Sequence, residues 1–160
     1  MSSAFFTTMA AVAACALAPP AEAQSRQVTL SAQLKNYGGN GAYLAVYLTD
    51  AKGAYVRTLW VAGGKAKYYT HLSDWNRLSS GDAKRLTGVT GASVGAGRTL
   101  NVTADLADAL IDAGYEIRID AAAEDMRDAP SDVRAQLSSA NSGKPQSGKQ
   151  YVQALTFQLK

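Results

Sequence analysis

The only histidine in the chain, His71, is the side chain best suited to acid–base or metal chemistry near neutral pH. With help from Glu124 or Asp125 it could bind one metal ion or a haem. Tight transition-metal sites take three or four protein ligands, however, and no second histidine is at hand. A histidine that hydrogen-bonds locally is the expected interpretation, and a metal or haem site on His71 is the alternative.

Aromatic residues surround this histidine in the sequence. Trp60, Tyr68 and Tyr69 precede it, and Trp75 follows. Beside Lys67 they could form a shelf for a flat ligand such as a flavin, a haem or a sugar. Burial in the core explains aromatic residues without any ligand and is the competing interpretation. The candidate surface for a ligand or a partner comprises Lys67, Tyr68, Tyr69, His71, Asp74 and Trp75.

An acidic cluster later in the chain could hold a hard cation such as Ca²⁺. Its spacing does not match a calcium-binding loop, and Arg127 and Arg134 lie among the acids and would neutralise them. A solvated loop is therefore the expected interpretation, and no metal site is predicted. The acidic residues are Glu124, Asp125, Asp128 and Asp132.

The signatures of common enzyme active sites are missing from the sequence. It contains no G-x-S-x-G nucleophile elbow, no phosphate-binding P-loop and no H-E-x-x-H zinc motif. Ser73 and Ser79 lie near His71 in the sequence, but nothing in the pattern orients the imidazole as a catalytic triad requires. We therefore expect a protein that is not an enzyme and has no catalytic residues.

Alternating apolar and polar residues predict that β-strands position these side chains. In residues 27–35, Val28, Leu30 and Ala32 share one face. Residues 42–50 carry apolar side chains on both faces, so both faces are expected to be covered. Seven segments with hairpin-like spacing favour an all-β fold, an antiparallel immunoglobulin-like β-sandwich. The predicted strands are residues 27–35, 42–50, 54–62, 99–106, 114–122, 132–138 and 150–160.

Residues 65–98 interrupt this pattern and are expected to form an insertion. Leu72, Trp75 and Leu78 recur every three residues, and Ser73 is suited to cap a helix, which predicts a short helix here. The stretch LTGVTGASVGAGRT that follows is rich in Gly, Ser and Thr. It is expected to be a long irregular loop that is either functional or mobile.

The N-terminal residues have the pattern of a secretory leader. Residues 4–17 form an apolar run too short to span a bilayer, and residues 21–23 (AEA) match a cleavage site. Cleavage would remove residues 1–23 as a signal peptide and leave 24–160 as a single domain in the periplasm, with no stable membrane insertion. Cys15 follows small residues that resemble a lipobox, so a lipoprotein anchored at Cys15 is the alternative.

Charge and cysteine content exclude other classes of protein. The formal net charge is +3 at pH 7, and no run of Lys or Arg resembles a nucleic-acid-binding stripe, so no nucleic-acid partner is expected. A single cysteine rules out an internal disulfide framework and a cysteine-based zinc site.

The order of three segments, KYYTHLSDWNR, VTGAS and GYEIRIDAAAED, resembles domain of unknown function family 2271, a group of predicted periplasmic bacterial proteins. The resemblance runs from about Gln27 to the C-terminus. It implies an exported β-sandwich without an assigned molecular function. It also implies a neighbourhood of PepSY-type membrane proteins and flavin transferases, linked to extracytoplasmic electron transfer and iron.

Residues 90–93 (TGAS) are similar to the acceptor pattern D-x-x-[ST]-G-A-[ST], to which a periplasmic flavin transferase attaches FMN through a phosphoester. The acceptor hydroxyl would be that of Ser93, and Thr90 occupies the other hydroxyl position. Thr87 stands where the pattern has Asp. A Gly-rich loop that turns back between the sheets is the competing interpretation.

Three hypotheses about function follow from these observations. The leading one is a non-enzymatic periplasmic accessory or binding module without a cofactor, serving a membrane-bound redox or iron-uptake system. The first alternative is an electron-transfer protein that carries FMN covalently on Ser93. The second is a metal- or haem-binding protein that uses His71.

Overall fold

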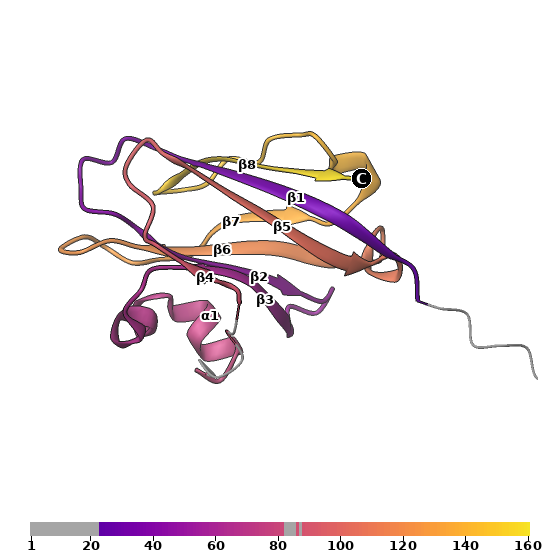
Figure 1. Ribbon diagram of the computed structural model, residues 1–160, viewed down its shortest axis with the longest axis horizontal. Coiled ribbons are helices and arrows are strands. Elements are labelled where there is room, and N and C mark those ends of the chain that lie inside the picture. The colour runs from indigo at the N-terminus through magenta and orange to yellow at the C-terminus, as the bar shows by residue number, and fades with distance from the viewer. Residues whose placement is uncertain (1–22, 82–85, 87) are drawn as a thin grey trace, which may run out of the picture.

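The computed structural model describes residues 23–81, 86 and 88–160, which form two β-sheets and a few short helices (Figure 1). The predicted signal peptide, the lipobox cysteine Cys15 and Thr87 lie outside the described residues, apart from Ala23. The strands are β1 (Ser25–Leu34), β2 (Tyr43–Thr49), β3 (Tyr55–Ala62), β4 (Thr90–Gly91), β5 (Thr99–Ala107), β6 (Glu116–Ala122), β7 (Ala129–Gln136) and β8 (Val152–Leu159). The α-helix is α1 (Ser73–Leu78), and the 3₁₀ helices are η1 (Ala66–His71), η3 (Asp108–Leu110) and η4 (Ser139–Asn141).

The sheets form the predicted all-β sandwich. One sheet has the strand order β5-β1-β8, and the other has the order β4-β3-β2-β6-β7. Every pairing is antiparallel except the short parallel one between β3 and β4. The first strand pairs with β5 and β8, whereas the first two strands of an immunoglobulin domain pair with each other. The likeness to immunoglobulin domains therefore lies in the two-sheet architecture.

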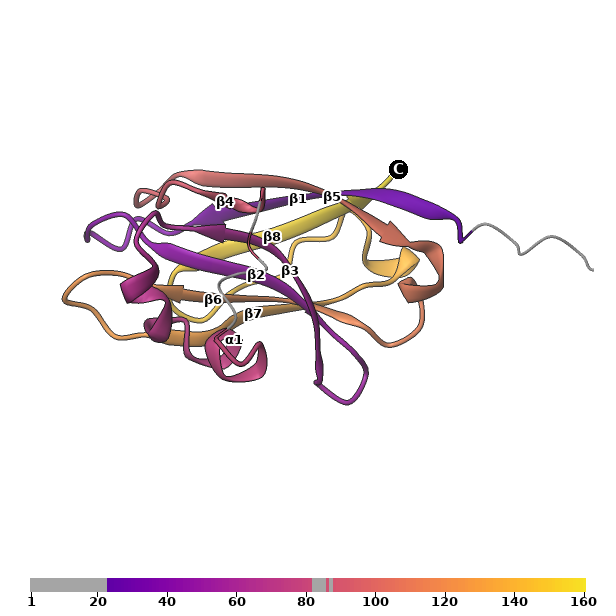
Figure 2. The same ribbon diagram turned by 60° about the horizontal axis from the view of Figure 1, so that its bottom comes forward.

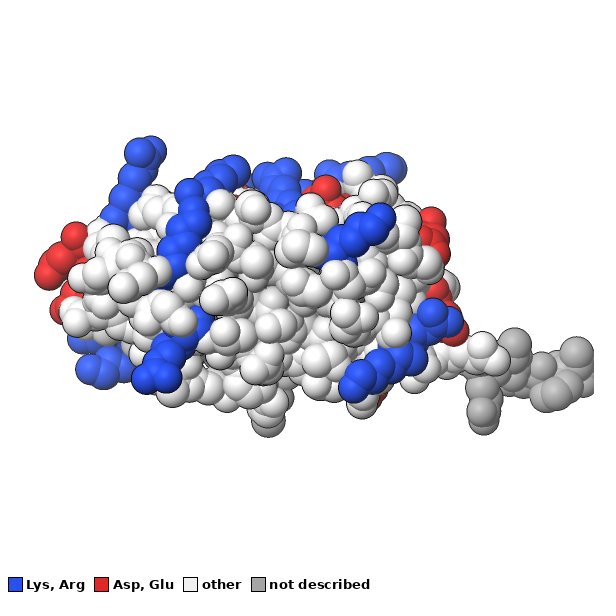
Figure 3. Space-filling model, turned by 90° about the horizontal axis from the view of Figure 1, so that it is seen from above, with Lys and Arg blue, Asp and Glu red and all other residues white. Residues whose placement is uncertain are grey.

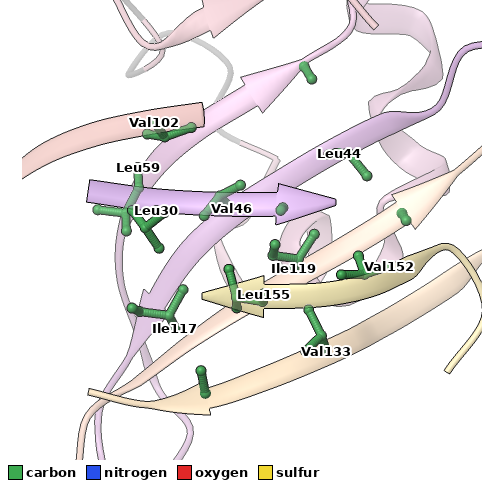
Figure 4. Close-up of a cluster of buried hydrophobic side chains, with 14 of the residues drawn as sticks. Leu30, Leu44, Val46, Leu59, Val102, Ile117, Ile119, Val133, Val152 and Leu155 are labelled. Carbon is green, nitrogen blue, oxygen red and sulfur yellow. The ribbon is translucent and has the colours of Figure 1, made fainter. Parts of the chain in front are cut away.

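Alternation along the strands places one apolar face of each sheet in a common core. Leu30 and Leu155 from one sheet meet Val46 and Ile119 from the other in this layer (Figure 4). The predicted inward residues of 27–35 are all buried. Each large side chain that is fully buried here stabilises the fold by roughly 2 kcal/mol.

A second, smaller core covers the outer face of the five-stranded sheet. Tyr47 and Val61 from this sheet pack against Tyr69 of η1, Trp75 of α1 and Leu72, which lies between the two helices. Figure 1 shows α1 against the five-stranded sheet, on the side away from β1, β5 and β8. The molecule thus has three layers, and the expectation that both faces of residues 42–50 are covered is confirmed.

A buried carboxylate from the sheet caps α1, and the prediction that Ser73 is the N-cap is wrong. The N-cap residue is Leu72, and its side chain makes no capping hydrogen bond. Instead, the backbone N–H of Trp75 donates to Asp120 Oδ2 of β6 at 2.7 Å. A helix this short has little stability of its own, so its position depends on this contact and on the packing of its apolar face.

The long insertion is more regular than expected at one point. Thr90 and Gly91 form the two-residue strand β4, which pairs with Val61 and Ala62 at the end of β3. An isolated antiparallel bridge then joins Val94 to residue 42. These pairings hold the Gly-rich segment against the five-stranded sheet, close to the start of β2.

Three loops gather at one end of the sandwich (Figures 1 and 2). They are the connection between β1 and β2, the segment 63–71 after β3, and the turn between β6 and β7. The outer face of the three-stranded sheet is different (Figure 3). There Lys and Arg side chains are dispersed singly, and Asp and Glu lie towards the two ends.

Candidate functional site

The loops at this end surround a cavity of about 600 Å³, which we name the end cleft. Its walls come from four parts of the chain: residues 40–43, residues 65–71, Ser93 and residues 122–128. Segments that are far apart in the sequence therefore contribute to one concave surface. Loops held by a rigid β-sandwich are a common place for binding residues.

His71 pairs with an acid across the end cleft. Its Nδ1 lies 3.1 Å from Asp128 Oδ2, and the two side chains are 56% and 36% exposed. A carboxylate only accepts hydrogen bonds, so Nδ1 carries the proton, and Nε2 makes no hydrogen bond to the other described residues. The sequence suggested Glu124 or Asp125 as the acid beside His71. It did not indicate Asp128 for this role, because no spacing pattern relates two residues that are 57 positions apart.

This pair corrects the interpretation that nothing orients the imidazole of His71. Asp128 bonds to Nδ1 as the acid of a catalytic triad does, but this pair is exposed to water, whereas the triad acid is buried. Among the hydrogen bonds of the described residues, however, none joins His71 to a serine. The pair is therefore an oriented hydrogen-bonding group, and within the described part of the chain it makes no hydrogen bond to a serine.

Tyr68 gives the end cleft an exposed aromatic wall. Its side chain is 37% exposed, and its ring meets that of Tyr43 edge-on with 5.6 Å between centroids. Lys67 Nζ lies 4.8 Å from the centroid of the Tyr68 ring, which places a cation beside it. Tyr68 therefore fits the predicted ligand surface, and Lys67 supports it from outside the cavity wall.

Tyr69 and Trp75, which were also predicted for the ligand surface, are buried and do not line the end cleft. Tyr69 is 8% exposed and Trp75 is 1% exposed, because both fill the core between α1 and the five-stranded sheet. The Tyr69 hydroxyl donates to the carbonyl of Gly63 at 2.8 Å, and Trp75 Nε1 donates to Thr58 Oγ1 at 2.8 Å. Burial explains these two aromatic residues without any ligand.

Asp74 also has a structural role. Burial would raise its pKa, but hydrogen bonds from Ser131 and Arg77 outweigh burial and hold the pKa below its usual value. Ser131 Oγ donates to Asp74 Oδ2 at 2.8 Å, and Arg77 Nη2 lies 3.2 Å from Asp74 Oδ1. Asp74 thus ties α1 to β7 and to its own last turn.

The predicted acidic cluster separates into two groups. Glu124 and Asp125 are exposed and line the end cleft, and Glu124 Oε2 accepts a hydrogen bond from Asn40 Nδ2 at 3.0 Å. Asp132 is instead buried, which contradicts the expected solvated loop. It accepts the backbone N–H groups of Gln150, Tyr151 and Val152 at 2.6, 3.0 and 2.7 Å. Asp132 thus fixes the start of β8.

The two hydroxyls of the TGAS segment differ in position. Ser93 is exposed and lines the end cleft close to Gly41, where an added Cβ would lie 2.7 Å from Ser93 Oγ. Thr90 is exposed on β4 and does not line this cavity. Of the two, Ser93 shares its surroundings with Tyr68 and His71.

Within residues 23–81, 86 and 88–160, no three His, Cys, Asp or Glu side chains converge as a metal ion requires. In the same part of the chain, no helix has the length and apolar character needed to cross a bilayer.

Residues 25–154 match the sequence profile of DUF2271, described as a predicted periplasmic protein. The chain belongs to this family. No curated protein and no solved structure matches it. The match covers β1 to β7 and the first residues of β8, so the end cleft of this DUF2271 protein is built entirely from residues within the family region.

Proposed function

We propose that this DUF2271 protein is a non-enzymatic periplasmic binding module that holds its ligand in the end cleft. The observation that carries the proposal is the meeting of an exposed ring, Tyr68, and an oriented histidine, His71, in one cavity. Ligand sites combine apolar or aromatic walls with a few fixed polar groups. We further propose that the module serves a membrane-bound redox or iron-uptake system, with a PepSY-type membrane protein as its partner.

Mass spectrometry under non-denaturing conditions tests the binding function. Protein isolated from its native periplasm should carry a bound compound that dissociates on denaturation. Tyr68→Ala and His71→Ala should each lose it. Val56→Ala is the matched control, because Val56 is an equally exposed apolar residue at the far end of β3 from the cleft. Loss in Val56→Ala as well, or no bound compound in the native protein, contradicts the proposal.

Binding to the partner is measured separately. The purified periplasmic part of a PepSY-type membrane protein should bind the native chain and bind Tyr68→Ala more weakly. Equal binding by both would show that the partner contacts a surface other than the end cleft. No binding by either would contradict the proposed partner, while the proposed binding of a ligand would be unaffected.

A second candidate function is supported by the position of Ser93. Ser93 is exposed and lines the same cavity as Tyr68, so an FMN attached to its hydroxyl through a phosphoester could pack its flat ring against Tyr68. Protein from cells with a flavin transferase should then show an FMN-sized mass increase. The increase should vanish in Ser93→Ala and persist in Thr90→Ala. An unmodified chain from such cells contradicts this candidate.

A further inference from the structure

We infer that the end cleft binds a zwitterion, an amino acid or a short peptide, with the carboxylate of the ligand near Lys65 and its ammonium group near Glu124 and Asp125. This inference rests on the proposed binding function. It is drawn from how charges are distributed around the cleft.

The cleft has a cationic side and an acidic side. Lys65 stands just before η1 on one side, and Glu124 and Asp125 lie in the turn after β6 on the other. The contact between His71 and Asp128 spans the two sides. Lys65 on one side and Glu124 and Asp125 on the other therefore bring opposite charges to one cavity of about 600 Å³.

These outer charges are not neutralised within the part of the chain that the structure describes. There Lys65 and Asp125 have no ion-pair partner, and Glu124 contacts only the neutral amide of Asn40. Charged side chains that face each other across a cavity are matched best by a ligand that carries both signs. The ammonium and carboxylate groups of a peptide supply both signs.

Other ligand classes fit this arrangement less well. A purely anionic ligand would meet Glu124, Asp125 and Asp128, and a purely cationic one would meet Lys65. A neutral sugar could hydrogen-bond to these side chains through its hydroxyls, but it carries no charge to complement theirs. The exposed ring of Tyr68 adds an apolar surface on which a side chain of the ligand can pack.

Solution NMR with one dipeptide and its blocked form tests the inference. The probe is alanyl-tyrosine, and the control ligand is the same dipeptide with an acetylated N-terminus and an amidated C-terminus. The free dipeptide should shift the backbone signals of residues 65–71 and 123–128. The blocked form should bind about tenfold more weakly, because it carries neither charge.

Variants assign the two charged contacts. Lys65→Gln and Glu124→Gln should each weaken dipeptide binding about fivefold or more. Lys52→Gln, in the turn between β2 and β3 at the opposite end, and Asp105→Asn, on β5, are matched controls and should bind as the native chain does. Equal effects of Lys65→Gln and Lys52→Gln would overturn the inference.

The outcomes separate this inference from the proposed function. If both forms of the dipeptide shift the cleft signals equally, the cleft binds a ligand but the inference that this ligand is a zwitterion is wrong. If neither shifts them while the native protein carries another compound, the zwitterion is again wrong and the binding function stands. If neither shifts them and the native protein carries nothing, both fail.

Discussion

At the scale of single residues, buried carboxylates decide how the parts of this protein are joined. Asp120 is fully buried, and burial raises its pKa. Its Oδ1 accepts hydrogen bonds from the Tyr47 hydroxyl and the Ser131 N–H, and its Oδ2 accepts the N–H of Trp75. One side chain therefore connects β2, β7 and α1 to β6.

Removing this carboxylate should destabilise the fold strongly. Asp120→Ala leaves the backbone N–H groups of Trp75 and Ser131 without an acceptor, and the Tyr47 hydroxyl keeps only its 3.4 Å contact with Ser131 Oγ. One unsatisfied buried group costs about 1–3 kcal/mol, so we expect a loss of about 3 kcal/mol or more. Urea denaturation measures the free energy of unfolding. Asp105→Ala, on the exposed side of β5, should change it by less than about 0.5 kcal/mol. Similar values for the two variants would show that Asp120 is not a structural centre.

The pKa of Asp112 is lowered by Ser139, and this makes stability depend on pH. The Ser139 hydroxyl and N–H donate to the two carboxylate oxygens at 2.7 and 2.8 Å. A lowered pKa in the folded state contributes stability above the unfolded pKa of about 3.9, and this stability is lost as pH falls through the folded pKa. The contribution is therefore absent in strong acid.

Ser139→Ala tests the cause of this shift. The variant keeps the backbone hydrogen bond and loses the hydroxyl, so the pKa of Asp112 should rise towards its ordinary value. Carbon-13 NMR titration of the carboxyl group measures it. Thr103→Ala, on the exposed face of β5, should leave the pKa of Asp112 where it is. No difference between the two variants would assign the shift to something other than the Ser139 hydroxyl.

At the scale of elements, α1 is a short helix fixed by its surroundings. Trp75 has 1% of its surface exposed, and its ring meets that of Tyr69 edge-on with 5.7 Å between centroids. Leu72, the residue just before α1, is also fully buried. Tyr68, which is neighbour to Tyr69 in the chain, faces the end cleft instead. One segment thus presents one aromatic ring to the core and another to the cavity.

This division predicts opposite results for two aromatic substitutions. Trp75→Ala should cost about 4 kcal/mol of stability, because it empties a large buried volume and removes the hydrogen bond to Thr58. Tyr68→Ala should cost far less, because Tyr68 is 37% exposed and lies outside both buried clusters. Thermal unfolding followed by circular dichroism compares them. A larger loss in Tyr68→Ala would contradict the assignment of the two rings.

Period-two alternation predicted the seven longer strands, because each has one face in the main core. The start of β7 was placed three residues late, since Pro130 and the polar residues around it resemble a loop. In the structure Ser131 and Asp132 are buried polar residues that are held by hydrogen bonds, so this part of the strand has no apolar pattern to reveal it. The short strand β4 depends wholly on its pairing with β3, which no local pattern reveals.

The candidate site was predictable only in its parts. The aromatic and histidine residues of segment 65–71 could be singled out by type, and so could the exposed acids after β6. Their meeting in one cavity depends on the sandwich, which folds these distant segments to the same end. The burial of Trp75 could be anticipated from its helical spacing. That Tyr68 lines the cavity instead of the core is decided by how η1 and α1 pack on the sheet, which the spacing does not show.

At the scale of the whole molecule, the end cleft lies at one end of a three-layered structure. The two cores stabilise the sheets and α1, while the exposed side chains of the end cleft, such as Tyr68, Glu124 and Asp125, lie outside both buried clusters. Substitutions of these exposed side chains should therefore change binding with little change in stability. This separation is what a binding module requires of its scaffold.

The most direct test of the central claim is carboxyl labelling of the folded protein with a carbodiimide and an amine, with and without the small-molecule fraction of its native periplasm. A ligand in the end cleft should reduce the labelling of Glu124 and Asp125 and leave that of Asp105 unchanged. Equal labelling of Glu124 and Asp125 in both samples would show that the cleft is not where this protein binds its ligand.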